Sequence, residues 1–487
     1  MQSDAQSRER VVARARRAVV PAVHRVLVAQ NATLAPSVAR DQHLAALASG
    51  AAAVVTGQQV GLFLGPLYTL YKAASAIVMA RALAAETGVP VVPVFWLQTE
   101  DHDLLEIASC EVAHGATCET IAVPVDAANR VSIAHLTLPA EISGCVDQLA
   151  EVLGSGPDAL THLERVRRHY RVGARWSDAF AGLLGELFAD EGLVVIDPRD
   201  PVLAGIVAPV HHRAIEDAPR IADALLARCA KLDRTTVHVR PGSPLSFFHP
   251  DGPTGPRVRL EPDFDRSVLS ADPMAFSTSA LLRPIVQDTL LPTAAYVGGP
   301  AELAYFAQLP PLYQAFDRPM PMVVERGHFR IVDERSRRVL ARLGIDASQL
   351  AGSEADLLAR LRPNATSDVP SRLLAGFLSA HDAIAPASPG ATKALARTRA
   401  SVERSLGKLG AKLERIAAYE DVELVDAVRR ARAWLAPDGE LQERRLGLPC
   451  FAARMGDRAL VEKLLAAASP FDPSMKEISG PSTKELS

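Results

Sequence analysis

The feature that most constrains the fold is an apolar run that ends in a glycine-rich loop and is followed by a helical pattern. The run covers residues 51–55, the loop covers residues 56–68, and apolar residues then recur at helical spacing up to residue 83. This order predicts a buried strand, a loop and a helix. Three glycines in the loop let its backbone approach a ligand or adopt positive φ angles. The loop therefore suits a binding site, although a tight turn without any ligand would fit the same residues.

Strand-like and helix-like patterns recur along the first 330 residues. Gly88 and Pro90 end the helix that follows the glycine-rich loop. Strands that alternate with helices form βαβ units, which predict an α/β fold with a parallel sheet and right-handed crossovers. Open parallel sheets bind small molecules at the carboxyl ends of their strands. The predicted strands are 52–55, 91–96, 192–197, 293–297 and 321–325, and the predicted helices include 71–86 and 301–309.

Composition narrows the class of protein. The 487 residues suggest two or three domains, and 48% apolar with 22% charged residues is typical of a globular protein. A net charge of −3 gives no electrostatic case for nucleic acid as a partner. Five scattered cysteines form no CxxC pair, which favours a reducing compartment and a cytoplasmic location. No apolar run reaches the length of a membrane span, so we expect no membrane partner.

The chain is expected to contain a core, a helical arm and a C-terminal region. Within residues 391–436 apolar residues recur at seven-residue spacing, which is typical of a coiled-coil seam. A helical hairpin that packs on itself fits this short seam as well as an intermolecular coiled coil does. The seam residues are Leu395, Val402, Leu406, Leu409, Leu413 and Ile416. The predicted parts are a core at 1–330, with a helical insertion at about 126–190 and a loop-rich lobe at about 241–273, an arm at 331–437, helices packing on the core at 438–470, and a disordered tail at 471–487.

A polar cluster follows the strand predicted at 91–96. Glu100, Asp101, His102 and Asp103 cannot all be buried, because burying unpaired charge is costly. They lie at the same sheet edge as the glycine-rich loop, so we expect a general-base pair or a metal site. We favour proton transfer without a metal, because no second ligand set at diagnostic spacing supports a metal. A solvated acidic helix start is the simpler alternative.

A third cluster surrounds the strand predicted at 293–297. A double glycine that opens a helix can hold an anion with its backbone N–H groups. Arg283 could clamp a carboxylate or phosphate, although an arginine in such a place more often forms a surface ion pair. Lys72 could reach the mouth of the same pocket, and a snorkelling surface lysine fits this position equally well. The candidate binding residues are Thr56, Gly57, Gln58, Gln59, Gly65, Tyr68, Lys72, Asp103, Arg283, Gln287, Asp288, Tyr296, Gly298, Gly299 and Glu302, and the candidate catalytic residues are Glu100, Asp101 and His102.

Together these motifs closely resemble the cysteine ligase family of bacillithiol biosynthesis, the cysteine-adding enzymes. The resemblance extends from about residue 51 to about residue 467. It rests on Thr56-Gly57-Gln58-Gln59…Gly65-Pro66-Leu67-Tyr68, on Pro93-Val94-Phe95-Trp96…Glu100-Asp101-His102-Asp103, on Leu282-Arg283-Pro284-Ile285-Val286-Gln287-Asp288…Gly298-Gly299-Pro300-Ala301-Glu302-Leu303-Ala304-Tyr305-Phe306, and on Leu441-Gln442-Glu443-Arg444.

The resemblance implies a Rossmann-like core with inserted connecting segments and a coiled-coil arm that forms a homodimer. It implies amide-bond formation between cysteine and glucosaminyl-malate (GlcN-Mal). The core of the family is similar to that of class I aminoacyl-tRNA synthetases, yet this chain has neither a HIGH-type nor a KMSKS-type motif. The activating cofactor is therefore open, and a nucleotide such as ATP or ADP is one candidate.

Two other functions fit the residues without the resemblance. One is a Rossmann-type sugar-nucleotide transferase that uses Glu100 or Asp101 as its base. The other is a non-catalytic scaffold whose helical arm binds a partner. The residues alone predict an anionic small molecule at the edge of a parallel sheet.

Overall fold

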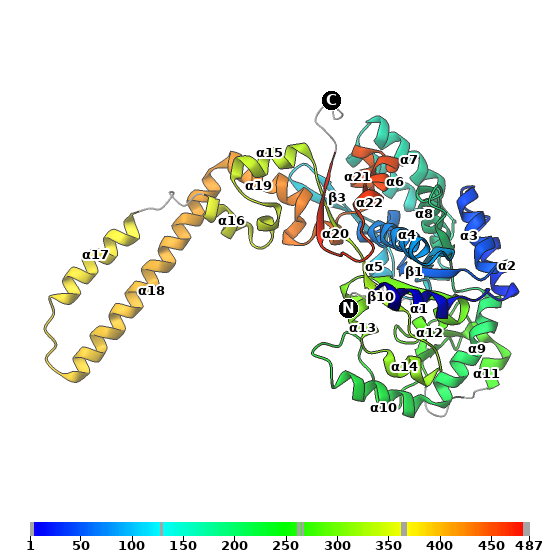
Figure 1. Cartoon of the computed structure of the whole chain (residues 1–487). Coiled ribbons are helices and arrows are strands. Elements are labelled where there is room, and N and C mark those ends of the chain that lie inside the picture. Colours follow the sequence, from blue (N-terminus) through cyan, green and yellow to red (C-terminus); the bar gives the residue numbers. More distant parts are fainter. Residues whose placement is uncertain (1–3, 127–129, 261–263, 265–266, 362–367, 481–487) are drawn as a thin grey trace. The chain divides into compact units, whose positions relative to one another are not determined.

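The computed structural model describes residues 4–126, 130–260, 264, 267–361 and 368–480 (Figure 1). These residues form two compact units. The first unit contains the described residues within 1–112, 119–331 and 443–487, and the second contains those within 113–118 and 332–442. No helix among the described residues is both long and apolar enough to cross a membrane.

The first unit is built on a five-stranded parallel sheet. Its strand order is β10-β9-β1-β2-β5, so the first strand of the chain lies at the centre. Ala52 of β1 pairs with Val91 of β2, and the register continues to Gln58 and Leu97. All five predicted strands and the Rossmann-like α/β fold class are confirmed. The strands are β1 (Ala52–Gln58), β2 (Val91–Leu97), β5 (Val194–Ile196), β9 (Thr293–Gly298) and β10 (Met322–Glu325).

Helices cover both faces of this sheet, because successive side chains of a strand point to opposite sides. Ala53 and Val55 of β1 pack with α2, α3, α9, α10, α12 and α14 on one face. Ala52 and Val54 pack with α1 and α4 on the other face. The helices named here are α1 (Ala5–Ala15), α2 (Pro21–Asn31), α3 (Val38–Ala48), α4 (Tyr68–Thr87), α9 (Pro201–Glu216), α10 (Ala218–Cys229), α12 (Arg283–Leu290) and α14 (Pro310–Ala315).

The segments inserted between the strands contain both helices and strands. Residues between 130 and 190 are mostly helical. The predicted loop-rich lobe contributes two strands, which form a three-stranded antiparallel sheet with β8 in the order β7-β6-β8. The lobe's positions 261–263 and 265–266 lie outside the described residues. The inserted elements are α5 (Leu104–Ile107), β3 (Ser109–His114), β4 (Thr117–Ala122), η2 (Ile133–His135), α6 (Ile142–Leu153), α7 (Pro157–His169), α8 (Trp176–Leu187), β6 (Ser246–Phe248), β7 (Val258–Arg259), α11 (Ser267–Ala271), η3 (Pro273–Ala275) and β8 (Phe276–Thr278).

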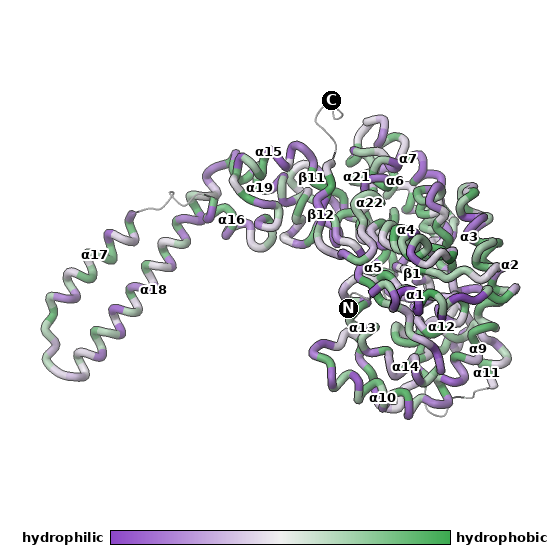
Figure 2. The backbone as a smooth tube through the Cα atoms, in the orientation of Figure 1, coloured by the Kyte–Doolittle hydropathy of each residue, from purple (hydrophilic) through white to green (hydrophobic). Residues whose placement is uncertain are grey.

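The second unit is helical, and its longest helix is α18 (Pro389–Glu420). This confirms the predicted long helix. Helix α17 (Val369–Asp382) lies beside α18, with Pro370 against Gly410 (Figure 1). Polar and apolar residues alternate along both helices (Figure 2). The predicted seam is only half-buried, and Ile416 is 48% exposed. The other elements are α15 (Glu334–Leu343), η4 (Ala347–Leu350), α16 (Glu354–Leu361), α19 (Val422–Leu435) and η5 (Pro437–Gly439).

The C-terminal region returns to the first unit. The tail predicted to be disordered from residue 471 instead contains β12 (Met475–Ser479), which pairs with β11 (His328–Val332). The prediction failed there because the partner strand is remote in sequence, and Ile478 of β12 is buried. Residues 481–487 lie outside the described part. The remaining elements are η1 (Leu62–Leu64), α13 (Pro300–Phe306), α20 (Gln442–Arg445), α21 (Leu448–Met455) and α22 (Asp457–Ala467).

Candidate active site

A cavity of about 280 Å³ lies at the carboxyl edge of the parallel sheet, where the loops after β1, β2, β9 and β10 meet. Binding at this edge is the expected behaviour of open α/β sheets. Ten of the residues singled out from the sequence line the cavity. They are Gly57, Gln58, Gln59, Tyr68, Lys72, Asp101, Arg283, Tyr296, Gly299 and Glu302.

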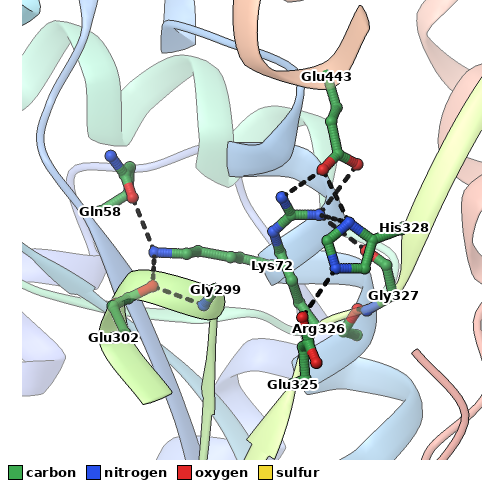
Figure 3. A network of polar contacts seen from close by, with 10 residues as sticks. Gln58, Lys72, Gly299, Glu302, Glu325, Arg326, Gly327, His328 and Glu443 are labelled. Atoms are coloured by element: carbon green, nitrogen blue, oxygen red, sulfur yellow. Dashed lines mark hydrogen bonds and ion pairs between the residues drawn. The ribbon is translucent and has the colours of Figure 1, made fainter. Parts of the chain in front are cut away.

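Lys72 is a buried charge of the cavity, with only 3% of its surface exposed. Its Nζ donates to the carbonyl oxygen of Gly57 and to Oε1 of Gln58, both at 2.8 Å, and forms an ion pair with Glu302 (Figure 3). Burial lowers the pKa of the Lys72 ammonium, and the charge of Glu302 offsets part of that effect. Because Lys72 is buried, it is not a snorkelling surface lysine.

Glu302 holds the first turn of α13. Its carboxylate accepts the backbone N–H of Gly299 at 2.7 Å and the hydroxyl of Tyr296 at 2.5 Å, in addition to the Lys72 contact. Burial would raise the pKa of Glu302, but Lys72 and these donors lower it overall. The Gly299 N–H that was expected to bind an external anion is therefore used by Glu302. Gly298 ends β9 beside Glu325 and lies outside the cavity wall.

Arg283 borders the cavity but is held by internal partners. It donates to Gln287 Oε1 at 2.8 Å and to the Tyr305 hydroxyl at 2.9 Å, and its guanidinium lies 5.1 Å from the Tyr296 ring centre. Gln287 in turn donates to Asp288 at 3.0 Å, behind the wall. Burial raises the pKa of Asp288 to about 6, although three hydrogen bonds oppose it. These residues form a buried support rather than an open anion clamp.

The acidic part of the cavity is centred on Asp101. Gln59 Nε2 donates to Asp101 at 2.8 Å and to Glu106 at 2.7 Å, and Arg257 lies 3.2 Å from the same aspartate. Burial alone would raise the pKa of Asp101. The contacts with His102, Arg257 and Gln59 outweigh burial and hold the pKa well below its usual range. Asp101 therefore keeps its negative charge and is a poor proton acceptor near neutral pH.

The other residues of the acidic cluster are not among the residues that line the cavity. Glu100 accepts the backbone N–H of Thr278 at 3.3 Å and also its hydroxyl. Nδ1 of His102 lies 3.5 Å from Asp101. Asp103 is exposed and precedes α5, so the segment is not itself helical. Asp101 is the member of this cluster that lines the cavity.

The glycine-rich loop is tightly packed rather than open. Phe63 and Leu64 are buried with φ angles of 51° and 72°, a region that non-glycine residues rarely adopt. A Cβ atom on Gly61 would lie 2.9 Å from the Cα of Gly65, so this close approach requires glycine. Gly65 shapes the loop from outside the cavity wall. Thr56 also lies outside the wall, and its hydroxyl donates to Val297 at 2.7 Å.

The structure adds two arginines that the sequence did not single out as site residues. Arg326, after β10, and Arg444, on α20, both line the cavity. Arg326 is bound at 2.6 Å by the buried Glu443, which also lies 2.9 Å from Nδ1 of His328 (Figure 3). The Leu441–Arg444 motif carries part of the family resemblance, but no local pattern places it at this sheet edge. The other added lining residues are Gln98, Glu106, Ala280, Pro300, Ala301 and Tyr305.

Backbone pairing brings α20 to the cavity. Leu67 donates its N–H to the carbonyl of Leu446 at 2.9 Å, and Gly447 donates to Glu111 at 2.8 Å. Pro66 and Gly447 also form an isolated β-bridge. The C-terminal segment is thereby fixed to the loop that precedes Tyr68.

A second cavity, of about 660 Å³, lies beside β5. Arg168, Arg171 and Arg175 line it together with Asp178 and Asp200. It contains none of the candidate residues from the sequence. Among the described residues, no group of three or more His, Cys, Asp or Glu side chains is placed to hold a metal ion.

Comparison with known proteins identifies the family. Residues 2–327 match the family model of the bacillithiol biosynthesis BshC N-terminal Rossmann-like domain. The chain belongs to the BshC family. This confirms the resemblance seen in the sequence motifs.

Several BshC relatives carry the name "Putative cysteine ligase BshC". That of Salinibacter ruber is 34% identical, over 81% of this chain and 77% of the relative. That of Koribacter versatilis is 32% identical, over 87% of this chain and 83% of the relative. That of Solibacter usitatus is also 32% identical, over 84% of this chain and 80% of the relative. A solved chain described as a "putative arginyl T-RNA synthetase" from Campylobacter jejuni has a TM-score of 0.25 and 9% identity, over 90% of this chain and 100% of that chain. A similarity this low indicates nothing about fold or function.

Proposed function

We propose that this protein is a cysteine ligase of bacillithiol biosynthesis that joins cysteine to GlcN-Mal through an amide bond. The observation that carries the proposal is the match of residues 2–327 to the BshC family, together with relatives named as cysteine ligases. We further propose that it acts in the cytoplasm, as a homodimer formed through the helical arm.

The charges that line the cavity support binding of small substrates that carry both positive and negative groups. Arg326 and Arg444 line it as cations, and Asp101 and Glu106 line it as anions. Cysteine carries an ammonium and a carboxylate, and GlcN-Mal carries an amine and carboxylates. A cavity with both signs of charge can hold either substrate by opposite charges.

Amide formation requires a base, because the protonated amine of the glucosamine unit is not a nucleophile. The amine loses its proton, attacks the activated carboxyl carbon of cysteine, and expels the activating group as the amide forms. Imidazole suits proton exchange near neutral pH. We therefore propose His102, whose ring lies next to the lining residue Asp101, as the base. Asp101, which stays ionised beside it, would orient the imidazole and attract the ammonium.

The test is restoration of bacillithiol in a host that lacks its own enzyme for this step, measured by mass spectrometry. The wild-type chain should restore the thiol, and His102→Ala should reduce it by about two to four orders of magnitude if His102 is the base. His24→Ala, on α2 and away from the cavity, is the matched control and should restore it fully. Soluble wild-type protein that restores no thiol would overturn the proposal.

A thermal-shift screen separates this function from the alternatives. Cysteine, GlcN-Mal, ATP and nucleotide sugars would be tested singly and with EDTA. Stabilisation by cysteine or GlcN-Mal that persists with EDTA agrees with a ligase that needs no metal for binding. Stabilisation by a nucleotide sugar alone would indicate a transferase. A phenotype unchanged by replacing Gln58 and His102 with alanine would indicate a scaffold.

A further inference from the structure

The hydrogen-bond directions around Lys72 are fixed by its chemistry. An ammonium group has three donors and no acceptor. Its three partners are the Gly57 carbonyl, Oε1 of Gln58 and the carboxylate of Glu302. The amide of Gln58 must therefore turn its oxygen toward Lys72 and its nitrogen away.

That orientation sets the direction of the next hydrogen bond. Nε2 of Gln58 faces the Tyr68 hydroxyl at 3.3 Å, and an amide nitrogen only donates. The Tyr68 oxygen is thus the acceptor, and its own proton is not used on Gln58. Among the described residues no acceptor takes that proton. The second hydrogen on Gln58 Nε2 likewise has no acceptor among the residues that the structure describes.

The two free donors lie in the cavity wall among charges of both signs, with Glu106 and Glu302 as well as the arginines. Tyr68 and Gln58 both line the cavity with Arg326 and Arg444, and the Arg326 guanidinium lies 5.7 Å from the Tyr68 ring centre. Burial, with a smaller contribution from Glu106, raises the pKa of Tyr68 to about 12, so the hydroxyl keeps its proton at neutral pH. Two unused donors in a cavity that also contains two arginines are suited to a carboxylate oxygen.

We propose that Gln58 and Tyr68 form a donor pair that binds a carboxylate oxygen of the substrate, and that Lys72 is the positioning residue that sets its direction. The assignment rests on the proposed function, which supplies a substrate with carboxylates. Lys72 need not touch the substrate. It acts by holding the Gln58 amide in one orientation, and Gln58 then holds the Tyr68 hydroxyl.

Isothermal titration of the full-length protein with L-malate tests the donor pair without requiring turnover. Tyr68→Phe should weaken binding about tenfold to a hundredfold, the usual loss for one hydrogen bond to a charged group. Tyr71→Phe is the matched control. It makes the same change on the same helix, its hydroxyl has no hydrogen-bond partner among the described residues, and it lies outside the cavity wall, so malate affinity should not change.

The positioning role of Lys72 is tested by combining variants. Lys72→Met should weaken malate binding, and in that background Tyr68→Phe should cost less than about threefold, because the hydroxyl is no longer oriented. A lysine that only stabilises the fold would leave the effect of Tyr68→Phe unchanged. If Lys72→Met does not fold, Gln58→Glu tests the direction of the hydrogen bonds instead. The glutamate still accepts from Lys72, but its second oxygen accepts the Tyr68 proton, so malate binding should be lost.

The outcomes separate the donor pair from the ligase activity. If the wild type binds L-malate in this pattern but makes no product from cysteine and GlcN-Mal, the proposed function is wrong and the donor pair stands. If product forms while Tyr68→Phe binds L-malate as the wild type does, the donor pair is wrong and the ligase stands. A wild type that does not bind L-malate overturns the carboxylate assignment.

Discussion

Loss of the Glu443 carboxylate should destabilise the first unit strongly. Glu443 and Arg326 have only 1% and 3% of their side chains exposed. The carboxylate accepts from two nitrogens of Arg326, at 3.1 and 2.6 Å, and contacts His328 at 2.9 Å. Removing one member of a buried ion pair leaves the other charge unpaired in a poorly hydrated site. That loss costs about 3–5 kcal/mol in the free energy of unfolding.

We expect Glu443→Gln to fall near the lower end of that range, because its amide oxygen still accepts one hydrogen bond from Arg326. Glu443→Leu should fall near the upper end. The matched control is Glu462→Gln, which breaks the Arg458–Glu462 pair on the surface of α22, where the side chains are 81% and 60% exposed. Exposed pairs of this kind contribute only about 0–1 kcal/mol.

Urea denaturation followed by tryptophan fluorescence measures these differences. Trp96 and Trp176 are buried in the first unit and report its unfolding. A second variant separates charge from packing. Replacing the pair together, with Arg326→Met and Glu443→Leu, leaves no unpaired charge and should recover most of the loss. A loss below about 1 kcal/mol for Glu443→Gln would refute the argument, and so would a double variant as unstable as Glu443→Leu.

Three further predictions concern other parts of the chain. The hydrogen bond with Glu443 raises the pKa of His328 above 6.5. The stability that the protonated imidazole adds is therefore fully present below pH 6.5 and is lost as pH rises through the raised pKa. Urea titrations should accordingly show the largest difference between wild type and His328→Gln at acidic pH. Gly57→Ala should destabilise, because its Cβ would lie 2.7 Å from a backbone oxygen of β2, whereas Gly205→Ala has open space and should be neutral or stabilise by up to about 1 kcal/mol in the same titration. Light scattering should give about twice the chain mass of 52.0 kDa, and Leu409→Glu with Leu413→Glu should give monomers, while a monomeric wild type would mean that the seam packs only within its own chain.

Local patterns were sufficient for the elements of the core. Each strand of the parallel sheet is an apolar run of ordinary strand length, and both faces of such a strand are buried, so its signal is strong. The start of α4 was predicted three residues late, since helix boundaries depend on caps and on neighbouring chain. The strand order β10-β9-β1-β2-β5 could not be predicted, because pairing between strands far apart in sequence leaves no local trace.

The candidate site was predicted where it consists of residues that end a strand or closely follow one. Gln58, Asp101 and Glu302 belong to such segments, and all three line the cavity. Arg326 and Arg444 were missed as site residues, although Arg326 directly follows a predicted strand and Arg444 belongs to a motif that carries the family resemblance. An arginine after a strand is usually a surface residue, and only the buried Glu443 partner distinguishes this one.

The sequence by itself determined the class of fold, the strands and the family, because these depend on apolar periodicity and on motifs that are contiguous in the chain. Tertiary structure alone decided which polar residues face the cavity and which support it. Arg283 and Lys72 look alike as candidate anion binders, yet both are held by internal acceptors. Whether a charged side chain is free or already satisfied depends on partners from other segments, and only folding brings those partners within hydrogen-bonding distance.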